Sequence, residues 1–210
     1  MSTPRKRGYS SATRVRAAEL TRARVLGAAK RLFARKGIDG VTIDQISEKA
    51  DVASSTVYAL FKSKAGILRA LMTDALFGPQ FKASQSLLAG VTDAAQLIAL
   101  SARVARAVYE AESAELGLLR GMSGFSPVLR KLEQEFEDIR YQMQEARVQL
   151  LFVQGKAKRG LDIDTARRVL WMYTGRDIYR MLVSDGGWHP DRYQEWLAGT
   201  LLDALVTKAP

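Results

Sequence analysis

The sequence predicts an all-α fold, and three observations support this. Apolar residues recur at helical spacing in most segments longer than about ten residues. The alternation of apolar and polar residues that marks a half-buried strand is absent from the sequence. Capping residues precede the apolar segments, and glycine or proline follows them. We therefore expect a basic flexible arm (1–20), a three-helix unit (21–72) and a longer helical bundle (73–210).

Local signals define the three helices of the N-terminal unit. An apolar stripe predicts the first helix, and Gly37 ends it as a left-handed cap. Thr42 and Gln45 have the spacing of a capping box that begins the second helix. A three-residue turn leads into the third helix, on which Val57 and Phe61 share the core side. These helices are expected at residues 21–36, 43–50 and 54–61.

The bundle is divided by the same kinds of signal. Ser63 caps a fourth helix that reaches about Phe77, where Gly78 and Pro79 end it. Later breaks coincide with single glycines, a glycine pair and a proline. The remaining helices are expected near residues 94–112, 114–122, 127–158, 165–184 and 190–207.

The positive charge is unevenly distributed. The chain carries a net charge of +10, and the whole excess falls within residues 1–70, whereas residues 71–210 are balanced. This asymmetry favours a polyanionic partner for the N-terminal part. For the arm, with Arg5, Lys6, Arg7, Arg14 and Arg16, two interpretations stay open. It either follows phosphates or enters the adjacent minor groove, or it is a solvated tail.

Two short helices joined by a tight turn form a helix-turn-helix, in which the second helix enters the major groove of DNA. Small hydroxyl-bearing residues of the third helix point away from its core side, so they can approach phosphates and base edges. Two lysines follow where a DNA strand would pass. The candidate DNA-binding residues are Thr42, Ser54, Ser55, Thr56, Tyr58, Lys62 and Lys64. A solvated face with a half-buried Tyr58 is the weaker alternative, given the charge and the capped helix pair.

A specific pattern extends over these helices. It comprises residues 24–37 (RVLGAAKRLFARKG), 41–46 (VTIDQI), 50–52 (ADV), 56–58 (TVY), Phe61 and 63–64 (SK). With this pattern, residues 21–72 resemble the DNA-binding domain of the tetracycline-repressor (TetR) family. The resemblance implies a dimer, a helical ligand-binding body and release from DNA when ligand binds. It also implies phosphate contacts by Thr42, Thr56, Tyr58 and Lys64, and base contacts by Ser54 and Ser55.

The chain departs from the family pattern at several positions. Asp51 stands where the family usually has glycine, and Ala53 where it usually has serine. Ala53 cannot cap the third helix, at a cost of about 1 kcal/mol unless Ser54 substitutes for it. Leu60 removes one expected phosphate contact. These departures leave the operator sequence undefined.

The last two expected helices are apolar around more than one face. Large residues cover most of the circumference of the 165–184 segment, and a continuous stripe follows the 190–207 segment. The resemblance implies that these two helices form the interface of a homodimer. Such a dimer would read a pseudo-palindromic double-stranded operator whose half-sites lie about one helical turn, or a multiple of it, apart.

Aromatic, methionine and arginine residues of the bundle are candidates for a pocket that binds a small apolar or aromatic effector. These residues are Arg103, Tyr109, Met122, Phe125, Tyr141, Trp171, Arg176 and Tyr179. Core packing is the better interpretation for most of the aromatic and methionine residues, and surface ion pairing explains the arginines equally well. Two functions therefore remain open. One is a ligand-responsive transcriptional regulator, a repressor released by its effector. The other is a DNA-bound dimer controlled by a protein partner or by its abundance, without a small-molecule pocket.

The residue inventory argues against an enzyme. His189 is the single histidine and cysteine is absent, so neither a zinc site nor a Cys/His nucleophile pair can be built. No phosphate-binding glycine-rich loop is present, and we expect no metal and no cofactor. No apolar run is long enough to cross a bilayer and no signal peptide is visible, so a cytoplasmic protein without a membrane partner is expected.

Overall fold

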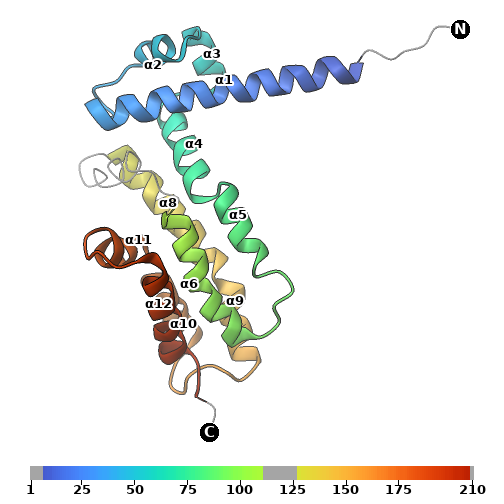
Figure 1. The fold of residues 1–210 in the computed structure, drawn as a ribbon, viewed down its shortest axis with the longest axis vertical. Coiled ribbons are helices and arrows are strands. Elements are labelled where there is room, and N and C mark those ends of the chain that lie inside the picture. The colour runs from blue at the N-terminus through green and yellow to red at the C-terminus, as the bar shows by residue number, and fades with distance from the viewer. Residues whose placement is uncertain (1–6, 111–126, 209–210) are drawn as a thin grey trace, which may run out of the picture. The chain divides into compact units, whose positions relative to one another are not determined.

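The computed structural model describes residues 7–110 and 127–208. These residues are helical apart from connecting loops, and their only β-type pairing is an isolated bridge between Ala157 and Val206 (Figure 1). The expected all-α fold is confirmed. The chain divides into two compact units, one containing residues up to 73 and the other most of the remainder. Within the described ranges, no helix has the length and apolar character needed to span a membrane.

The first unit contains the expected helix-turn-helix. Its helices are α1 (Arg7–Lys36), α2 (Ile43–Ala50) and α3 (Ser54–Phe61), and α4 (Lys64–Leu76) follows. The expected bounds of α2 and α3 are confirmed to the residue. The hydroxyl of Ser63 accepts a hydrogen bond from the Gly66 backbone at 3.1 Å, as expected for a cap of α4.

The described part of the segment expected to form a flexible arm, residues 7–20, is helical. Helix α1 begins at Arg7 rather than near Thr21, and its N-terminal half extends beyond α2 and α3 (Figure 1). Residues 12–20 are all exposed, so packing does not hold them helical. Alanine, arginine, glutamate and leucine have high helix propensity, and the helix propagates backward from its packed half.

The core of the first unit is formed by one face of each helix. Val25, Ala29 and Phe33 of α1 are fully buried, as are Ile46 of α2 and Val57 of α3. The two short helices bury little apolar surface by themselves, so the long α1 supplies the surface against which they are held.

The second unit differs from the expected helices in three places. Gly78–Pro79 ends α4 as expected but also begins a helix that was not expected, because proline is well tolerated at a helix start. The expected 127–158 helix is broken at Gln144 and ends at Val153, and the expected 165–184 helix is broken at Thr174–Gly175. The expected 114–122 helix lies outside the described residues. The observed elements are α5 (Pro79–Ser86), α6 (Ala94–Glu110), α8 (Pro127–Met143), α9 (Glu145–Val153), α10 (Ile163–Tyr173), α11 (Arg176–Tyr179), a π-helical turn (Arg180–Ser184) and α12 (Pro190–Leu205).

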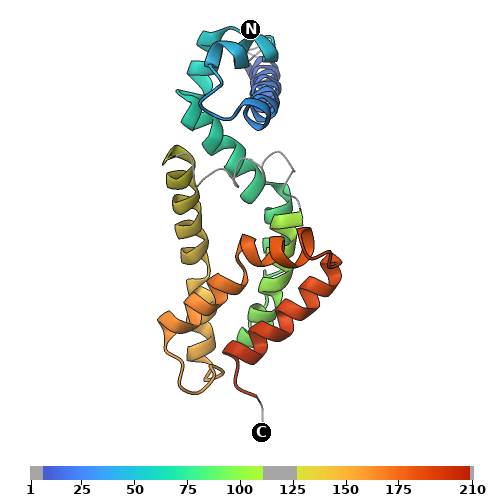
Figure 2. The same cartoon turned by 90° about the vertical axis from the view of Figure 1, so that its left-hand side faces the viewer.

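Helix α12 packs along α6 and forms the centre of the second core (Figure 2). Four residues spaced by one turn, Tyr193, Leu197, Leu201 and Leu205, are fully buried on one side of α12. They meet the small residues of α6, which allow the two helices to approach closely. This rigid pair supports one wall of the site described below.

Candidate nucleic-acid interface and ligand pocket

Capping interactions define both ends of α2. The Thr42 hydroxyl accepts a hydrogen bond from the Gln45 backbone at 3.2 Å, and the Gln45 side chain accepts one from the Thr42 backbone at 3.2 Å. The expected capping box is therefore confirmed. Thr42 is exposed, and its hydroxyl proton is available to a further acceptor such as a phosphate. Asp51 ends α2 in the left-handed conformation, with φ 53°.

Helix α3 presents a small, polar and exposed surface. Val57 and Phe61 are buried against the core, whereas Ser55 is exposed and Tyr58 keeps 52% of its surface in solvent. Thr56 is half-buried. Ala53 precedes α3 and has no side-chain cap, so the first backbone N–H groups of the helix have no such partner. Free N–H groups at a helix start favour an anion such as a phosphate.

Ser54 and Lys64 are both engaged within the chain. The hydroxyl of Ser54 lies 2.9 Å from that of Ser47, so its side chain faces α2 and does not replace Ala53 as the cap. The Lys64 ammonium donates to the carbonyl of Ile38 at 3.1 Å, which leaves two of its three donors for another acceptor. Lys62 is exposed and ends α3 with φ 66°.

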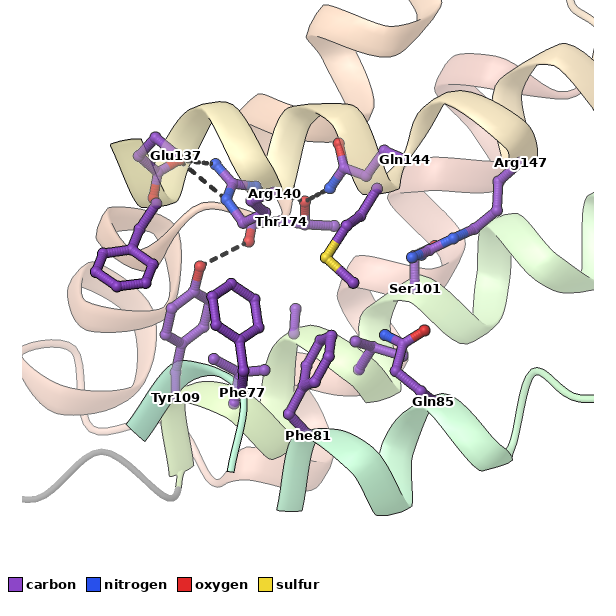
Figure 3. A pocket seen from close by; sticks show the side chains of 15 residues that line it. Phe77, Phe81, Gln85, Ser101, Tyr109, Glu137, Arg140, Gln144, Arg147 and Thr174 are labelled. Atoms are coloured by element: carbon purple, nitrogen blue, oxygen red, sulfur yellow. Dashed lines mark hydrogen bonds and ion pairs between the residues drawn. The ribbon is translucent and has the colours of Figure 1, made fainter. Parts of the chain in front are cut away.

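The second unit contains a pocket between α5, α6, α8 and α9 (Figure 3). Its empty space is about 600 Å³, which includes the part that is open to solvent. Most of the wall is aromatic or aliphatic, as is usual for small-molecule sites. The lining residues are Phe77, Phe81, Gln85, Ser101, Val104, Ala105, Val108, Tyr109, Phe136, Glu137, Arg140, Met143, Gln144, Arg147 and Thr174.

A hydrogen-bond network around Thr174 holds one wall of the pocket. The Thr174 hydroxyl donates to Leu170 O at 2.7 Å and accepts from Gln144 Nε2 at 2.8 Å and Arg140 Nη1 at 3.1 Å. The Tyr109 hydroxyl donates to the Thr174 carbonyl at 3.2 Å. Because these groups are already paired, this wall is preformed before any ligand arrives.

The guanidinium of Arg140 is neutralised within this network. It pairs with Glu137, and it also donates to the carbonyl of Trp171 at 2.8 Å. That carbonyl lies at the end of α10, so Arg140 helps to stabilise the break at Thr174–Gly175.

Of the sequence-predicted pocket residues, Tyr109 lies in the wall. Tyr179 packs behind it, with 5.8 Å between the ring centroids. The rings of Tyr141 and Trp171 meet edge to face with centroids 6.3 Å apart, and neither residue lines the pocket. Arg103 is exposed, and Arg176 is half-buried without lining the pocket. Met122 and Phe125 lie outside the described residues.

Sequence reasoning missed the contribution of α5 and α9. Phe77 and Phe81 are four residues apart on either side of Gly78–Pro79, a spacing that places both on one side if a helix continues. Proline after an apolar stretch predicts the end of a helix, so the sequence alone gives no reason to pair these two rings. Arg147 falls within the segment 127–158, which the sequence predicts to be one continuous helix.

Comparisons with known proteins find relatives of the helix-turn-helix unit and of most of the chain. Residues 25–71 match the sequence model described as "Bacterial regulatory proteins, tetR family". The chain is 25% identical over 175 residues to YdeS of Bacillus subtilis (strain 168), an uncharacterised HTH-type transcriptional regulator, with 79% of this chain and 80% of YdeS covered.

Solved structures of related fold extend over nearly the whole chain. NalD, the secondary repressor of the MexAB-OprM multidrug efflux pump in Pseudomonas aeruginosa, has a TM-score of 0.69 and 22% identity, with 92% of this chain and 100% of NalD covered. The SmeT–triclosan complex has a TM-score of 0.68 and 19% identity, with 90% and 93% covered. At these identities the similarity shows a common fold.

Proposed function

Given that its N-terminal domain belongs to the tetR family of bacterial regulatory proteins and makes the chain a DNA-binding transcriptional regulator, we propose that it is a repressor that a small molecule releases from its operator. One observation carries the proposal. The chain combines an exposed, uncapped α3 in its first unit with a preformed, largely apolar pocket in its second. A regulator needs the first feature to bind DNA and the second to respond to a ligand.

The DNA contacts follow from the exposure of each residue. Ser55 and Thr56 lie on the first turn of α3, where helix-turn-helix proteins contact base edges. Thr42, Tyr58, Lys62 and Lys64 contact phosphates, with Ser54 at the junction of α2 and α3. Arg14 and Arg16 lie on the exposed start of α1, where they extend the basic surface.

The protein acts as a homodimer through its last two helices. Helix α10 and the π-helical turn expose Met172 and Met181, each with 49% of its surface accessible. Exposed methionines of this kind are enriched at protein interfaces. A two-fold dimer would place two copies of α3 on successive half-sites of a pseudo-palindrome.

The effector is a small molecule with a substantial apolar part. NalD and SmeT share the fold, and SmeT was solved with triclosan, an aryl compound, so the fold accommodates such ligands. The pocket described here supports the same use. Its presence argues against the alternative in which only a protein partner or the abundance of the chain controls DNA binding.

The proposal is tested by finding the operator first and the effector second. Selection of bound duplexes from a random pool should give a two-fold symmetric site, and binding to it should weaken as salt rises. Apolar and aromatic compounds are then screened for release of the labelled operator, with at least a tenfold rise in its dissociation constant expected. Val108→Trp, which fills the pocket, should keep operator binding and lose release, whereas the exposed control Ala83→Trp should keep both.

Two results would contradict the proposal. One is the absence of salt-sensitive binding to any duplex. The other is undiminished release of the operator from Val108→Trp, which would place the effector elsewhere.

A further inference from the structure

Arg147 carries a charge that has no acidic partner among the described residues. It lies in the first turns of α9 and lines the pocket, where its Nη1 donates to the Ser101 hydroxyl at 2.8 Å. No carboxylate among the described residues lies within ion-pair distance of it. Other arginines of the unit differ, since Arg140 pairs with Glu137 and Arg167 lies 3.3 Å from Glu145.

Burial makes this lone charge unfavourable. Removal from water lowers the pKa of Arg147 below its ordinary value, and no neighbouring charge opposes the shift. Guanidinium offers five N–H donors in a planar fork, of which the chain uses one. An unpaired, partly buried cation is unfavourable, so the folded pocket favours a ligand that supplies negative charge at this point.

Two further polar atoms near the pocket lack partners. Within the described residues, the buried Nε2 of Gln85 and the buried Oε1 of Gln144 make no hydrogen bond. Gln85, Ser101 and Arg147 lie toward one end of the pocket, and Tyr109 and Glu137 toward the other (Figure 3). Buried donors without acceptors are rare in native proteins and call for an explanation. The end near Arg147 therefore presents unused donors from Gln85 of α5 and Arg147 of α9.

The remaining wall of the pocket determines which apolar group the ligand should carry. The rings of Phe77 and Phe81 meet edge to face with centroids 5.2 Å apart, and Phe136 lies 5.7 Å from Phe77. This aromatic cluster favours an alkyl chain or an aryl group. A purely apolar molecule would cover the cluster but would leave Arg147 without an anion.

We propose that the pocket binds an amphipathic carboxylate, with its carboxylate on Arg147 and Gln85 and its apolar part against Phe77, Phe81 and Phe136. The two oxygens of a carboxylate match the fork of a guanidinium, which makes this the favoured anion for a lone arginine. The inference rests on the proposed function, because it names the ligand class of the same pocket.

Calorimetric titration of the purified full chain tests the proposal without DNA. Two carboxylates, dodecanoate and 4-phenylbutanoate, are compared with their matching alcohols, dodecan-1-ol and 4-phenylbutan-1-ol. At least one carboxylate should bind tenfold or more tightly than its alcohol, and the two pairs distinguish alkyl from aryl ligands. Arg147→Met should abolish this preference, whereas Arg103→Met, which removes an exposed arginine, should preserve it.

A thermal melt establishes that Arg147→Met is folded. Replacing an unpaired, partly buried cation by an apolar chain should leave the midpoint of the ligand-free protein unchanged or higher. Ser101→Ala keeps the guanidinium and should therefore keep the preference for carboxylates, within about threefold of the original chain.

Three results would overturn the proposal: equal binding of carboxylate and alcohol, a preference that survives in Arg147→Met, or no binding of either pair. None of them depends on the operator. If neutral compounds still release the operator through the pocket, the proposed function stands and the carboxylate assignment fails. If no duplex binds, the proposed function fails while the titrations still decide the ligand class.

Discussion

The hydroxyl of Ser54 donates a hydrogen bond of 2.6 Å to the carboxylate of Asp44, so the first residue of α3 is anchored to the first turn of α2. Ala53 gives α3 no side-chain cap, and this polar link takes its place in holding the start of the helix. Ser54 is therefore a positioning residue, and Ser55, which is exposed one residue later, is the better candidate for reading bases.

Substitutions of the two serines should consequently have different effects. Ser54→Ala should lower the free energy of unfolding by about 1 kcal/mol, because its hydroxyl loses the bond to Asp44 and the partly buried contact with Ser47. It should weaken binding to all duplexes alike. Ser55→Ala should leave stability within about 0.5 kcal/mol of the original chain and alter the preference between duplexes. Urea denaturation and selection from random duplexes measure the two properties, and a change in base preference by Ser54→Ala alone would refute the division.

Asp51 has a strained backbone conformation, and its negative charge is unfavourable for DNA binding. Its φ of 53° lies in the left-handed region, where glycine has no steric penalty, and its fully exposed carboxylate is only 3.9 Å from Arg24. Asp51→Gly should raise the free energy of unfolding by about 0.5–1 kcal/mol, because the surface ion pair contributes little. It should also tighten DNA binding, since an anion near the phosphates is removed.

Asp51→Asn separates these two effects. Asparagine removes the charge but keeps a side chain at the left-handed position, so DNA binding should tighten while stability barely changes. Equal stabilisation by glycine and asparagine, measured by urea denaturation, would show that the charge and not the backbone is responsible.

Tyr58 and Lys62 should contribute to DNA binding through different physics. Tyr58→Phe removes a neutral hydroxyl and should weaken binding to all duplexes about fivefold, equivalent to about 1 kcal/mol. The dependence of affinity on salt should not change. Lys62→Ala removes one counterion-releasing contact and should reduce the slope of log K against log salt by about 1. Anisotropy titrations at several salt concentrations measure both quantities. An unchanged slope for Lys62→Ala would exclude its phosphate contact.

The parts of the fold that could be predicted from the sequence are those fixed by neighbouring residues. Thr42 and Gln45 satisfy each other's backbone within one turn, and this local signal located α2 correctly. The glycine pattern of the family even explains Asp51, because the position requires a left-handed residue.

The breaks in the second unit depend on distant partners and could not be predicted in that way. The break at Thr174 is stabilised by Arg140, which is 34 residues away in the sequence. Likewise, the sequence does not distinguish Arg147 from a surface arginine of a helix. Its special environment depends on α6, which places Ser101 beside it, and no carboxylate of the described residues lies within ion-pair distance. Tertiary contacts override helix propensity at both places.

The start of α6 should be sensitive to acid through Asp93. One oxygen of Asp93 caps the helix by accepting from the Gln96 backbone at 2.8 Å, and the carboxylate pairs with Lys156. The hydrogen bond from Lys156, followed by that from Gln96, holds the pKa of Asp93 below its ordinary value. A lowered pKa in the folded state stabilises the fold above the unfolded pKa of about 3.9, and this contribution disappears as the pH falls through the folded pKa.

Asp93→Asn isolates the charge, because asparagine caps a helix as well as aspartate. Its thermal midpoint should lie below that of the original chain at neutral pH, and the two should converge as the pH falls through the lowered pKa of Asp93. Lys156→Gln should cause no further loss in the Asp93→Asn background. A difference between the midpoints that stays constant over the whole pH range would contradict the role of the ion pair.

Gly199 tests the proposed dimer. It lies in the interior of α12 on an exposed face, and a Cβ added there would meet no atom within 4 Å. The chain's own packing therefore does not require glycine, although glycine destabilises a helix interior by about 1 kcal/mol relative to alanine. Close approach of a helix from the partner subunit would explain why glycine stands at position 199.

Gly199→Leu should accordingly weaken the homodimer at least tenfold in sedimentation equilibrium. In the monomer the same change should raise the thermal midpoint, because leucine favours the helix. Ala83→Leu adds a similar exposed side chain on α5 and should leave the dissociation constant unchanged. A dimer of undiminished affinity in Gly199→Leu would show that this face of α12 does not meet the partner, and would move the interface to the exposed methionines of α10 and the π-helical turn alone.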